Sequence, residues 1–447
     1  MTVNILYIHT HDSGRWFQPY GYNIPTPNIM RLAGEGILFR HCYNAGPSCS
    51  PSRAGLLTGM SPHSCGMLGL AHRGWKLNDY SKHIVQFLKA QGMETVLCGI
   101  QHEAPEESMI GYDQVLQDQN YNMGATKDDR ADWDRMNARA VASYIRERGS
   151  TSCKKPFFLS FGMFNTHREF PPVDEEINPD YVIPPFPLYD CSQNREDMAA
   201  YITSAKVVDK CTGIVLEALR ESGMEQNTLV IFTTDHGIAF PRMKCNLYDT
   251  GIGVTLIVKY PGNKMKGRAT DALVSQLDIF PTLCDMMQLE KPEWLQGVSL
   301  LPLLEGRAEK VRNEIFSEVT YHAAYEPMRC IRTERYKLIR FYDYHNDVVP
   351  ANMDDCLSKD FLLESGYLTE YKEREMLFDL YTDPVERENR VRDPRYKEIY
   401  KELSLKLGQW MKETEDPLLT SGYRIPKPEG AVANKLTIIS PRMDDFE

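Results

Sequence analysis

The sequence predicts an α/β protein with a mostly parallel sheet sandwiched by helices, followed by a smaller C-terminal α+β domain that carries an antiparallel sheet. Over residues 1–305, short apolar runs alternate with amphipathic segments, which is typical of strands joined by crossover helices. After residue 305, short strand-like runs follow one another without long helices between them. We therefore expect two domains, 1–305 and 306–447.

The first predicted strand is Asn4 to His9, an apolar run that ends in polar residues. Thr26-Pro27 then indicates a helix N-cap followed by a proline in the first turn, and this helix is expected to end near Gly36. The best amphipathic helix covers about residues 195–223. Further buried strands are expected at 94–99, 157–162, 229–235 and 255–260. Ligands are expected where the parallel strands end.

The C-terminal domain is predicted to contain four strands, at 313–321, 328–333, 336–342 and 376–382. A last helix follows, with Asp393 as its N-cap and Pro394 in its first turn. Its apolar stripe is expected to serve packing, and it consists of Tyr396, Ile399, Leu403, Leu407 and Trp410. The stretch 165–195 is rich in Pro, Asp and Tyr, and we expect an ordered surface loop there.

Charge and cysteine usage restrict the partners and the compartment. The net charge of −11 disfavours a nucleic-acid binder, and an anionic substrate would need cations gathered in one pocket. The 11 cysteines are scattered without a CxxC pair, which favours reduced thiols. Residues 1–8 show no basic signal-peptide region, and no apolar run is long enough to span a membrane. We therefore expect a cytoplasmic protein that does not bind membranes.

The most informative string is SCSPSRAGLLTG, from Ser48 to Gly59. One interpretation is a nucleophilic Cys49 at a helix N-terminus, with Arg53 to bind the oxygens of an anion. A capped helix start that contains a buried cysteine is an equal alternative. A tyrosine-phosphatase loop is disfavoured, because it needs a longer spacer than the three residues that separate Cys49 and Arg53.

This string resembles the signature of the type I sulfatases in the alkaline phosphatase superfamily, Cys-x-Pro-Ser-Arg followed by Leu-Thr-Gly. Further matches cover essentially the whole chain: 4–12, 99–102, 234–237, 244–251 and the string LFDLYTDPVERENRV. The resemblance implies an alkaline phosphatase-like fold and a C-terminal subdomain that completes the substrate pocket. Within the family, CSPSRAGLLTG, HSCGMLGL and TLVIFTTDHGIAFP look most similar to the N-sulfoglucosamine sulfohydrolases, or heparan N-sulfatases.

The resemblance also implies the chemistry. Cys49 would be converted to formylglycine by an intracellular maturase, and the aldehyde hydrate would attack sulfur. Arg53 and Lys244 would bind the sulfuryl oxygens. His167, with Lys244, would protonate the leaving group, and His102 would remove a proton from the second hydroxyl so that sulfate is expelled.

The resemblance implies one divalent metal, held by residue 49 and by two polar pairs that end predicted strands, His11-Asp12 and Asp235-His236. Calcium is favoured by the family, while the imidazoles also suit manganese or zinc, and magnesium is a further alternative. His11 departs from the family pattern, which has Asp there, so a strand-end histidine that binds no metal is an equal interpretation. Ile100 also departs, because it replaces a sulfate-binding Lys.

We expect a hydrolase that removes a sulfate ester or sulfamate from a small sulfated carbohydrate, with heparan-type N-sulfoglucosamine favoured. The candidate substrate contacts are His63, His72, Arg73, Glu318, His322 and Arg329. A homodimer is the default oligomer.

Three alternatives remain. A phosphonate monoester or phosphodiester hydrolase of the same superfamily is favoured by Ile100. A non-catalytic binder of sulfated glycans is favoured by His11 and Ile100, but it gives no reason to keep the nucleophile, Arg, Lys and both histidines together. A purely structural protein explains none of the polar strand ends.

Overall fold

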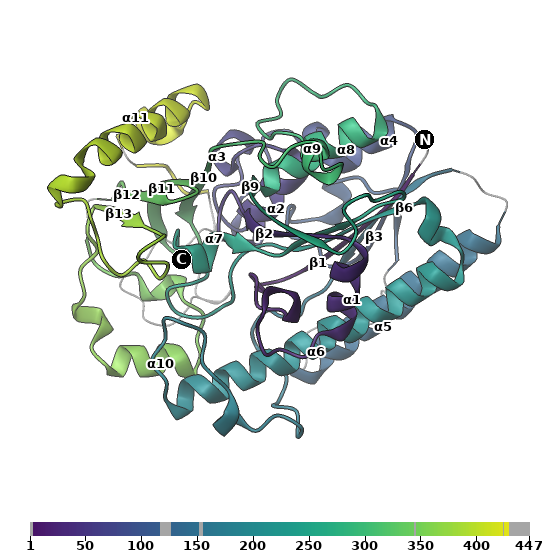
Figure 1. Cartoon of the computed structure of the whole chain (residues 1–447), viewed down its shortest axis with the longest axis horizontal. Coiled ribbons are helices and arrows are strands. Elements are labelled where there is room, and N and C mark those ends of the chain that lie inside the picture. The colour runs from purple at the N-terminus through teal and green to yellow at the C-terminus, as the bar shows by residue number, and fades with distance from the viewer. Residues whose placement is uncertain (1–2, 117–126, 152–154, 344–345, 423, 429–447) are drawn as a thin grey trace.

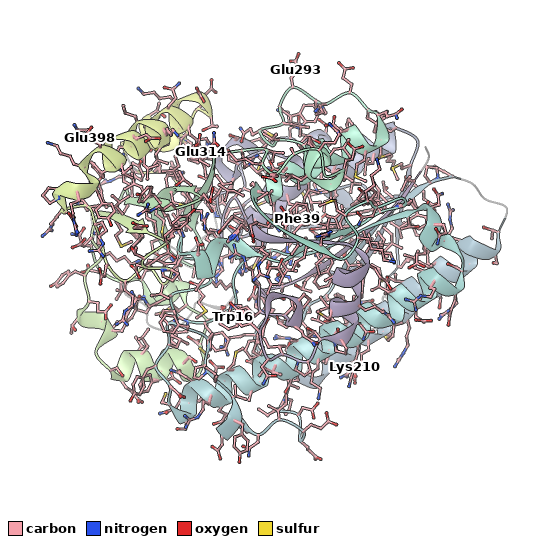
Figure 2. The ribbon with its side chains drawn as sticks, viewed as in Figure 1. Trp16, Phe39, Lys210, Glu293, Glu314 and Glu398 are labelled. Atoms are coloured by element: carbon pink, nitrogen blue, oxygen red, sulfur yellow. The ribbon has the colours of Figure 1, made fainter. Side chains whose placement is uncertain are left out.

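The computed structural model describes residues 3–116, 127–151, 155–343, 346–422 and 424–428. A large sheet lies between two layers of helices, and a small antiparallel sheet lies beside it (Figure 1). Charged side chains such as Glu293 and Glu398 project from the surface, whereas Phe39 lies inside (Figure 2). The predicted α/β fold with a second, antiparallel sheet is confirmed.

Among the described residues, nine strands form the large sheet, in the order β4-β3-β5-β1-β6-β8-β2-β7, with β9 pairing β2. Their bounds are β1 Asn4–Thr10, β2 Ile37–Tyr43, β3 Glu94–Gly99, β4 Gln114–Val115, β5 Phe157–Gly162, β6 Thr228–Thr234, β7 Gly253–Val254, β8 Leu256–Lys259 and β9 Arg268–Ser275. The block β4-β3-β5-β1-β6 is parallel throughout.

Strand β8 is predicted by the sequence, but it runs antiparallel to both β6 and β2. A parallel return would need a crossover helix behind the sheet. The chain between β6 and β8 contains only the four-residue helix α7, Asp249–Ile252, and the two-residue strand β7. Most of this segment remains at the carboxyl end of β6, where it contributes Lys244 to the candidate site described below.

The helices cover both faces of the sheet, because alternate residues of each central strand point to opposite sides. Leu6 and Ile8 of β1 pack with α1, α5 and α6, whereas Ile5 and Tyr7 pack with α2, α4 and α8. The helices of the two layers are α1 Pro27–Glu35, α5 Lys127–Ser150, α6 Ser192–Glu221, α2 Cys49–Thr58, α4 Ile84–Ala90 and α8 Ile279–Met287, and two short helices are α3 Pro62–Cys65 and α9 Leu301–Leu304.

Thr26 occupies the predicted N-cap position of α1, but its side chain does not cap the helix. Its hydroxyl accepts a hydrogen bond from the Gln18 amide at 2.9 Å and donates to the Ile24 carbonyl at 3.3 Å. Pro27 at the first helical position has no amide hydrogen, so one donor fewer needs a partner there. The helix therefore starts without a side-chain cap.

The second sheet has the order β10-β11-β12-β13 and is antiparallel, as predicted. Its strands are β10 Glu314–Tyr321, β11 Tyr325–Thr333, β12 Tyr336–Phe341 and β13 Glu375–Asp379, and its helices are α10 Leu357–Glu364 and α11 Lys397–Glu413. Asp393 caps a 3-10 turn that precedes α11 rather than α11 itself. Leu403 and Leu407 are buried against the sheet, which confirms the packing role of the stripe.

The stretch 165–195 begins with the buried residues Asn165 and Thr166 and then runs over the surface, with one short 3-10 turn, Pro179–Tyr181, before α6 begins. The ten cysteines in the described part are free, and Cys153 lies outside it. Within the described ranges, no helix combines the length and apolar character needed to cross a bilayer.

Candidate active site

The polar ends of the central strands meet at the amino end of α2. His11 and Asp12 follow β1, Asp235 and His236 follow β6, and Cys49 is the first residue of α2. The Cys49 Sγ lies 3.4 Å from His236 Nε2 and 4.0 Å from Asp12 Oδ1. All five side chains are almost fully buried. The expectation that these strand ends converge is met.

The carboxylate of Asp235 fixes the backbone of both strand ends. Its Oδ1 accepts hydrogen bonds from the Asp12 amide and from the His236 amide, each at 2.8 Å. Asp12 adopts a left-handed φ of 44°, which turns the chain sharply after β1. Strain of this kind is typical of functional sites and is retained because the surrounding hydrogen bonds hold it.

The donor atoms at this point fit a divalent metal. One donor atom each from Asp12, Cys49, Asp235 and His236 lie within 4.8 Å of one another. The His236 Nδ1 contacts the Gly237 carbonyl at 2.9 Å, which leaves the Nε2 lone pair facing Asp12 and Cys49.

His11 belongs to the same cluster, although it departs from the family pattern. Its Nδ1 lies 3.1 Å from Asp235 Oδ2 and 3.8 Å from Asp12 Oδ1, whereas its Nε2 is buried without a hydrogen-bond partner. A buried imidazole nitrogen with no partner is costly unless something absent from the protein atoms satisfies it, and two carboxylates beside the other nitrogen are further ligands for a cation. A metal ion would do so, which favours ligation by His11 over a strand-end role.

Arg53 is directed into the protein rather than outward. Its NH2 donates to Asp235 Oδ2 at 2.9 Å and to the Thr10 carbonyl at 2.8 Å, while NH1 contacts the Nδ1 of His9. Both terminal nitrogens are therefore occupied, and only Nε is buried without a partner. In this structure Arg53 positions and neutralises Asp235, and its predicted contact with sulfuryl oxygens stays a prediction.

Lys244 lies between two carboxylates, 2.9 Å from Asp12 Oδ2 and 2.9 Å from Asp354 Oδ2. Burial alone would lower the pKa of Lys244, but Asp12 and Asp354 together raise it well above its usual value. Lys244 therefore remains a cation beside residue 49. Asp354 was missed by sequence reasoning, because no motif marks the loop that precedes α10.

The thiol of Cys49 is a poor nucleophile in this environment. Burial raises its pKa well above the usual value, and Asp12 and Asp235 add to the effect against the opposing fields of Lys244 and Arg53. The thiolate is the reactive form of cysteine. The unmodified side chain would thus be inert at neutral pH, which agrees with the expectation that a modified residue acts here.

Two further histidines surround the cluster. The rings of His11 and His167 lie 5.3 Å apart, and those of His11 and His102 lie 5.8 Å apart. Burial, with the charge of Lys244, lowers the pKa of His167 to about 4. Burial and the neighbouring histidines and Arg53 lower the pKa of His102 well below its usual value. Both imidazoles are therefore neutral at pH 7.

Three of the predicted substrate contacts, His72, Arg73 and His322, lie beside the active-site cluster. His72 Nδ1 contacts His102 Nε2 at 3.0 Å, and His322 Nδ1 contacts the hydroxyl of Ser48 at 2.8 Å. Arg73 donates to the Ala323 carbonyl, next to His322.

The other three predicted contacts form a buried ion cluster, which corrects their assignment as substrate contacts. The Nδ1 of His63 contacts Glu318 at 2.8 Å, and Arg329 bridges Glu318 at 3.0 Å and Asp416 at 2.6 Å. Each is at most 7% exposed. The cluster joins α3, which carries His63, to the C-terminal part, and its members satisfy one another, so no charge in it needs a substrate group as its partner.

Asp134 on α5 is a second residue that sequence reasoning missed. Its carboxylate accepts hydrogen bonds from the Phe164 and Asn165 amides, both at 2.8 Å, and from the Asn165 side chain at 2.6 Å. The next residue, Thr166, donates to the His11 carbonyl at 2.9 Å. Asp134 therefore holds the segment that carries His167 against the end of β1. An acidic residue on the buried face of an amphipathic helix is the only sequence signal for it.

Two family models match the sequence: the Sulfatase model over residues 4–289, and the model described as N-sulphoglucosamine sulphohydrolase, C-terminal, over residues 236–355. The N-sulphoglucosamine sulphohydrolase of Homo sapiens is 29% identical, and the match covers 97% of this chain and 93% of that protein. An ulvan-active sulfatase of Formosa agariphila is 28% identical, with 94% of this chain and 82% of that protein covered.

Solved structures share the fold. A 2-O GAG sulfatase superposes with a TM-score of 0.72 at 21% identity, covering 98% of this chain and 100% of that chain. A protein solved in complex with its substrate D-glucosamine-2-N,6-O-disulfate gives a TM-score of 0.70 at 20% identity, over 93% and 99%. The phosphonate monoester hydrolase of Agrobacterium radiobacter gives 0.66 at 21% identity, over 94% and 97%. These likenesses confirm the expected alkaline phosphatase-like fold.

Proposed function

This chain belongs to the sulfatase family of sulfuric ester hydrolases, and from that premise we propose that its substrate is a small sulfated saccharide, with heparan-type N-sulfoglucosamine as the first candidate. The observation that carries the proposal is the position of Cys49, at the amino end of α2 and surrounded by Asp12, His236 and Lys244. The saccharide is supported by the second family model, which matches residues 236–355 and so includes both Lys244 and Asp354.

We propose that Asp12, Asp235, His236 and His11 hold one divalent metal together with residue 49. Calcium remains the first candidate from the family, and the two imidazoles also suit manganese or zinc, with magnesium as a further alternative. A bound metal would supply Lewis-acid stabilisation, and formylglycine at position 49 would supply the attacking hydroxyl. Metal analysis of the purified protein, and loss and recovery of activity on chelation and metal addition, test this site.

Three side chains would bind the sulfuryl group or transfer protons, and their surroundings set the protonation state of each. Lys244 carries a positive charge that would bind a sulfuryl oxygen, since Asp12 and Asp354 keep it protonated. His102 is neutral and would accept a proton from the nucleophilic residue. His167 is neutral in the free protein, but the negative sulfate of a bound substrate would raise its pKa, so that it can donate a proton to the leaving oxygen or nitrogen.

Intact-peptide mass spectrometry of active protein tests the modification: we expect formylglycine at residue 49. Cys49→Ala should abolish hydrolysis, whereas Cys284→Ala, which removes a buried thiol from α8, should retain it. Full activity in protein whose Cys49 is unmodified would contradict the proposal. Co-expression with a formylglycine-generating maturase should raise the activity of recombinant protein. Modification by an intracellular maturase presupposes a cytoplasmic protein, and that location stays a prediction. The homodimer also stays a prediction.

Hydrolysis of a phosphonate monoester is the second candidate function. It is favoured by the Asp235-His236 pair in the metal cluster and by Ile100 in place of a sulfate-binding lysine. A panel of N-sulfoglucosamine, 6-O-sulfated glucosamine, an aryl sulfate and an aryl phosphonate, assayed at equal enzyme concentration, separates the two. We expect the highest kcat/KM for a sulfated saccharide. A higher value for the phosphonate would transfer the assignment to the second candidate, and no turnover of any substrate would leave only a glycan binder.

A further inference from the structure

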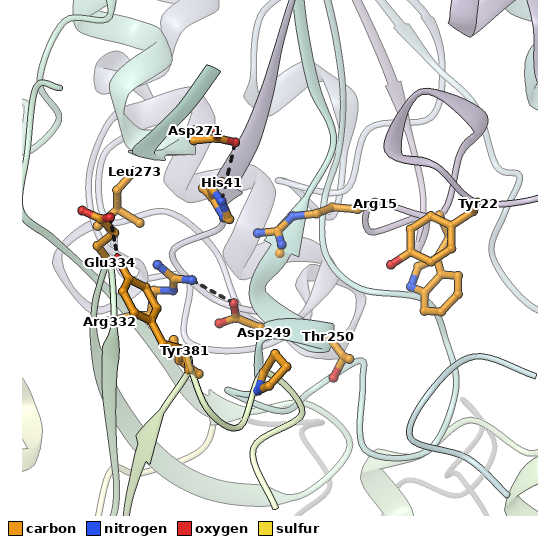
Figure 3. A pocket seen from close by; sticks show the side chains of 14 residues that line it. Arg15, Tyr22, His41, Asp249, Thr250, Asp271, Leu273, Arg332, Glu334 and Tyr381 are labelled. Carbon is orange, nitrogen blue, oxygen red and sulfur yellow. Dashed lines mark hydrogen bonds and ion pairs between the residues drawn. The ribbon is translucent and has the colours of Figure 1, made fainter. Parts of the chain in front are cut away.

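A cavity of about 510 Å³ lies between the two sheets, outside the candidate active site (Figure 3). None of its lining residues belongs to the cluster around Cys49. They come from the segment after Asp12, from β2, β9 and β11, and from the loops at α7 and after β13. This volume is in the range of cavities that hold small ligands.

Two guanidinium groups dominate the cavity. Those of Arg15 and Arg332 each lie over the ring of Tyr43, with 4.6 Å between the guanidinium carbon and the ring centroid. Arg332 is paired with Asp249 at 3.1 Å. Within the described residues, Arg15 has no carboxylate at ion-pair distance; its NH2 donates to the Cys42 carbonyl, and its side chain also hydrogen-bonds Tyr43. The Nε atoms of both arginines are buried without a hydrogen-bond partner.

His41 reports the electrostatic potential at this point. In Figure 3 its ring lies between Arg15 and Arg332. Burial, then the charges of Arg15 and Arg332, lower its pKa to about 4, against the weaker opposing effects of Asp249 and Asp271. Asp271 has a side chain that is 80% exposed, so solvent screens it. Three carboxylates also line the cavity: Asp249 is paired with Arg332, Glu334 accepts a hydrogen bond from Tyr381, and Asp271 lies 3.9 Å from His41. Among the described lining residues, Arg15 is therefore the cation that is left without a carboxylate at ion-pair distance.

Aromatic rings flank the charged groups. Trp16 and Tyr22 stack with centroids 4.1 Å apart, and Tyr22 keeps 37% of its surface exposed. Tyr381, on the other side of Arg15 in Figure 3, is 60% exposed. Aromatic faces beside fixed cations suit a ring with an attached anion better than a bare inorganic ion, which would leave most of the volume unfilled.

We propose that this cavity binds an anionic sugar unit, with its carboxylate or sulfate against Arg15 and His41 and its ring beside Tyr22 or Tyr381. Arg15 and the half-exposed His41 supply the donors that such a group needs. The proposal does not depend on hydrolysis at Cys49, because no residue is shared between the two sites.

Glucuronic acid is the sharpest probe, because it carries an anion and a sugar ring but no sulfate to hydrolyse. We would titrate it into the full-length Cys49→Ala protein and follow the ring proton of His41 by NMR, assigned with His41→Gln. An anion within a few ångströms of His41 should raise its pKa by about 1 unit. Arg15→Gln should remove this shift and weaken binding at least tenfold by calorimetry. Arg31→Gln, on the exposed side of α1, should change neither.

The comparison with inorganic sulfate separates a sugar site from a simple anion site. We expect N-sulfoglucosamine and glucuronic acid to shift His41 at lower concentration than sulfate, and Tyr22→Ala to weaken the sugars but not sulfate. Equal responses to sulfate and to the sugars would overturn the proposal, as would an unchanged His41 pKa with every ligand. If Arg15→Gln does not fold, Arg15→Lys provides the test, since it keeps the charge but loses the planar donor geometry and should weaken binding.

Discussion

At the scale of single residues, the charges of the active site occur as buried pairs with defined partners. Arg53 pairs with Asp235, and Lys244 is shared between Asp12 and Asp354. Removing one member of such a pair leaves an uncompensated buried charge, which costs far more than the pair contributes. The arrangement explains why a protein of net charge −11 can present a cation to an anionic substrate.

Asp354 provides the clearest test at this scale. Asp354→Asn removes one of the two carboxylates that hold the ammonium group of Lys244, so we expect kcat/KM to fall roughly 10- to 100-fold, as for other groups that orient active-site residues. The neighbouring Asp355→Asn is the matched control, because the Asp355 side chain is 45% exposed and pairs with Lys359. Steady-state kinetics of both variants check this. Equal activity of the two would show that Asp354 does not position Lys244.

Sequence reasoning located residues that belong to a spaced motif. Cys49, Arg53 and the two strand-end pairs lie together, as their positions predict. It failed for Asp354, whose contact with Lys244 joins residues 110 positions apart and depends on how the C-terminal part docks. It also misassigned His63, Glu318 and Arg329, because a charged residue in a sequence does not show whether its partner is a substrate or another side chain.

At the scale of elements, the pattern of strands and helices predicts the layers of the fold but not the direction of every strand. Apolar runs identify β1, β3, β5, β6 and β8 as buried strands, yet β8 is antiparallel, because direction depends on the connection and not on the strand itself. Helix α5 contributes more than a covering layer, since its Asp134 fixes the segment that carries His167.

Asp134→Asn tests this link between helix and site. Both carboxylate oxygens accept N–H groups, so an amide nitrogen in place of one oxygen would face a donor and cost about 1–3 kcal/mol of stability. Displacement of the 163–168 segment should lower kcat roughly 10²-fold. Asp132→Asn, on the exposed side of the same helix, is the control. Thermal unfolding and kinetics measure the two effects, and a variant of unchanged kcat would contradict a positioning role.

His83 gives an element-scale prediction on pH. Its Nδ1 accepts from the Val85 amide and caps α4, and burial lowers its pKa to about 3. Between about pH 6.5 and pH 3 the unfolded chain binds a proton that the folded protein excludes, so this residue makes stability fall on acidification, by up to about 5 kcal/mol.

His83→Asn keeps an N-cap acceptor but cannot be protonated. The variant should therefore lose less stability than the parent between pH 7 and pH 4, although the cavity left by the smaller side chain lowers its stability at pH 7. Denaturant unfolding at several pH values measures this. Parallel pH profiles for parent and variant would show that His83 is not the source of acid sensitivity.

At the scale of the whole molecule, the two sheets share their interior. One apolar cluster combines Tyr43 and Leu247 from the large part with Ile315 and Met328 from the small one. An ion network crosses the same boundary, because Lys337 of β12, which is fully buried, lies 2.5 Å from Asp249. Composition and strand pattern predict the division near residue 305, which stays a prediction, but they do not show how much of each surface the other part covers.

The shared interior predicts that the large part is not stable alone. A fragment of residues 1–305 would expose the apolar side chains of Tyr43, Leu247 and Ile252, and it would leave Asp249 without its cationic partners Arg332 and Lys337. We expect this fragment to aggregate or remain unfolded. The full chain should unfold in one calorimetric transition, with a van't Hoff enthalpy close to the calorimetric one. Two separated transitions, or a soluble fragment with a cooperative unfolding curve, would show that the parts fold independently. Asp354 would then reach Lys244 only through docking of two preformed bodies, and activity would be lost before the large sheet unfolds.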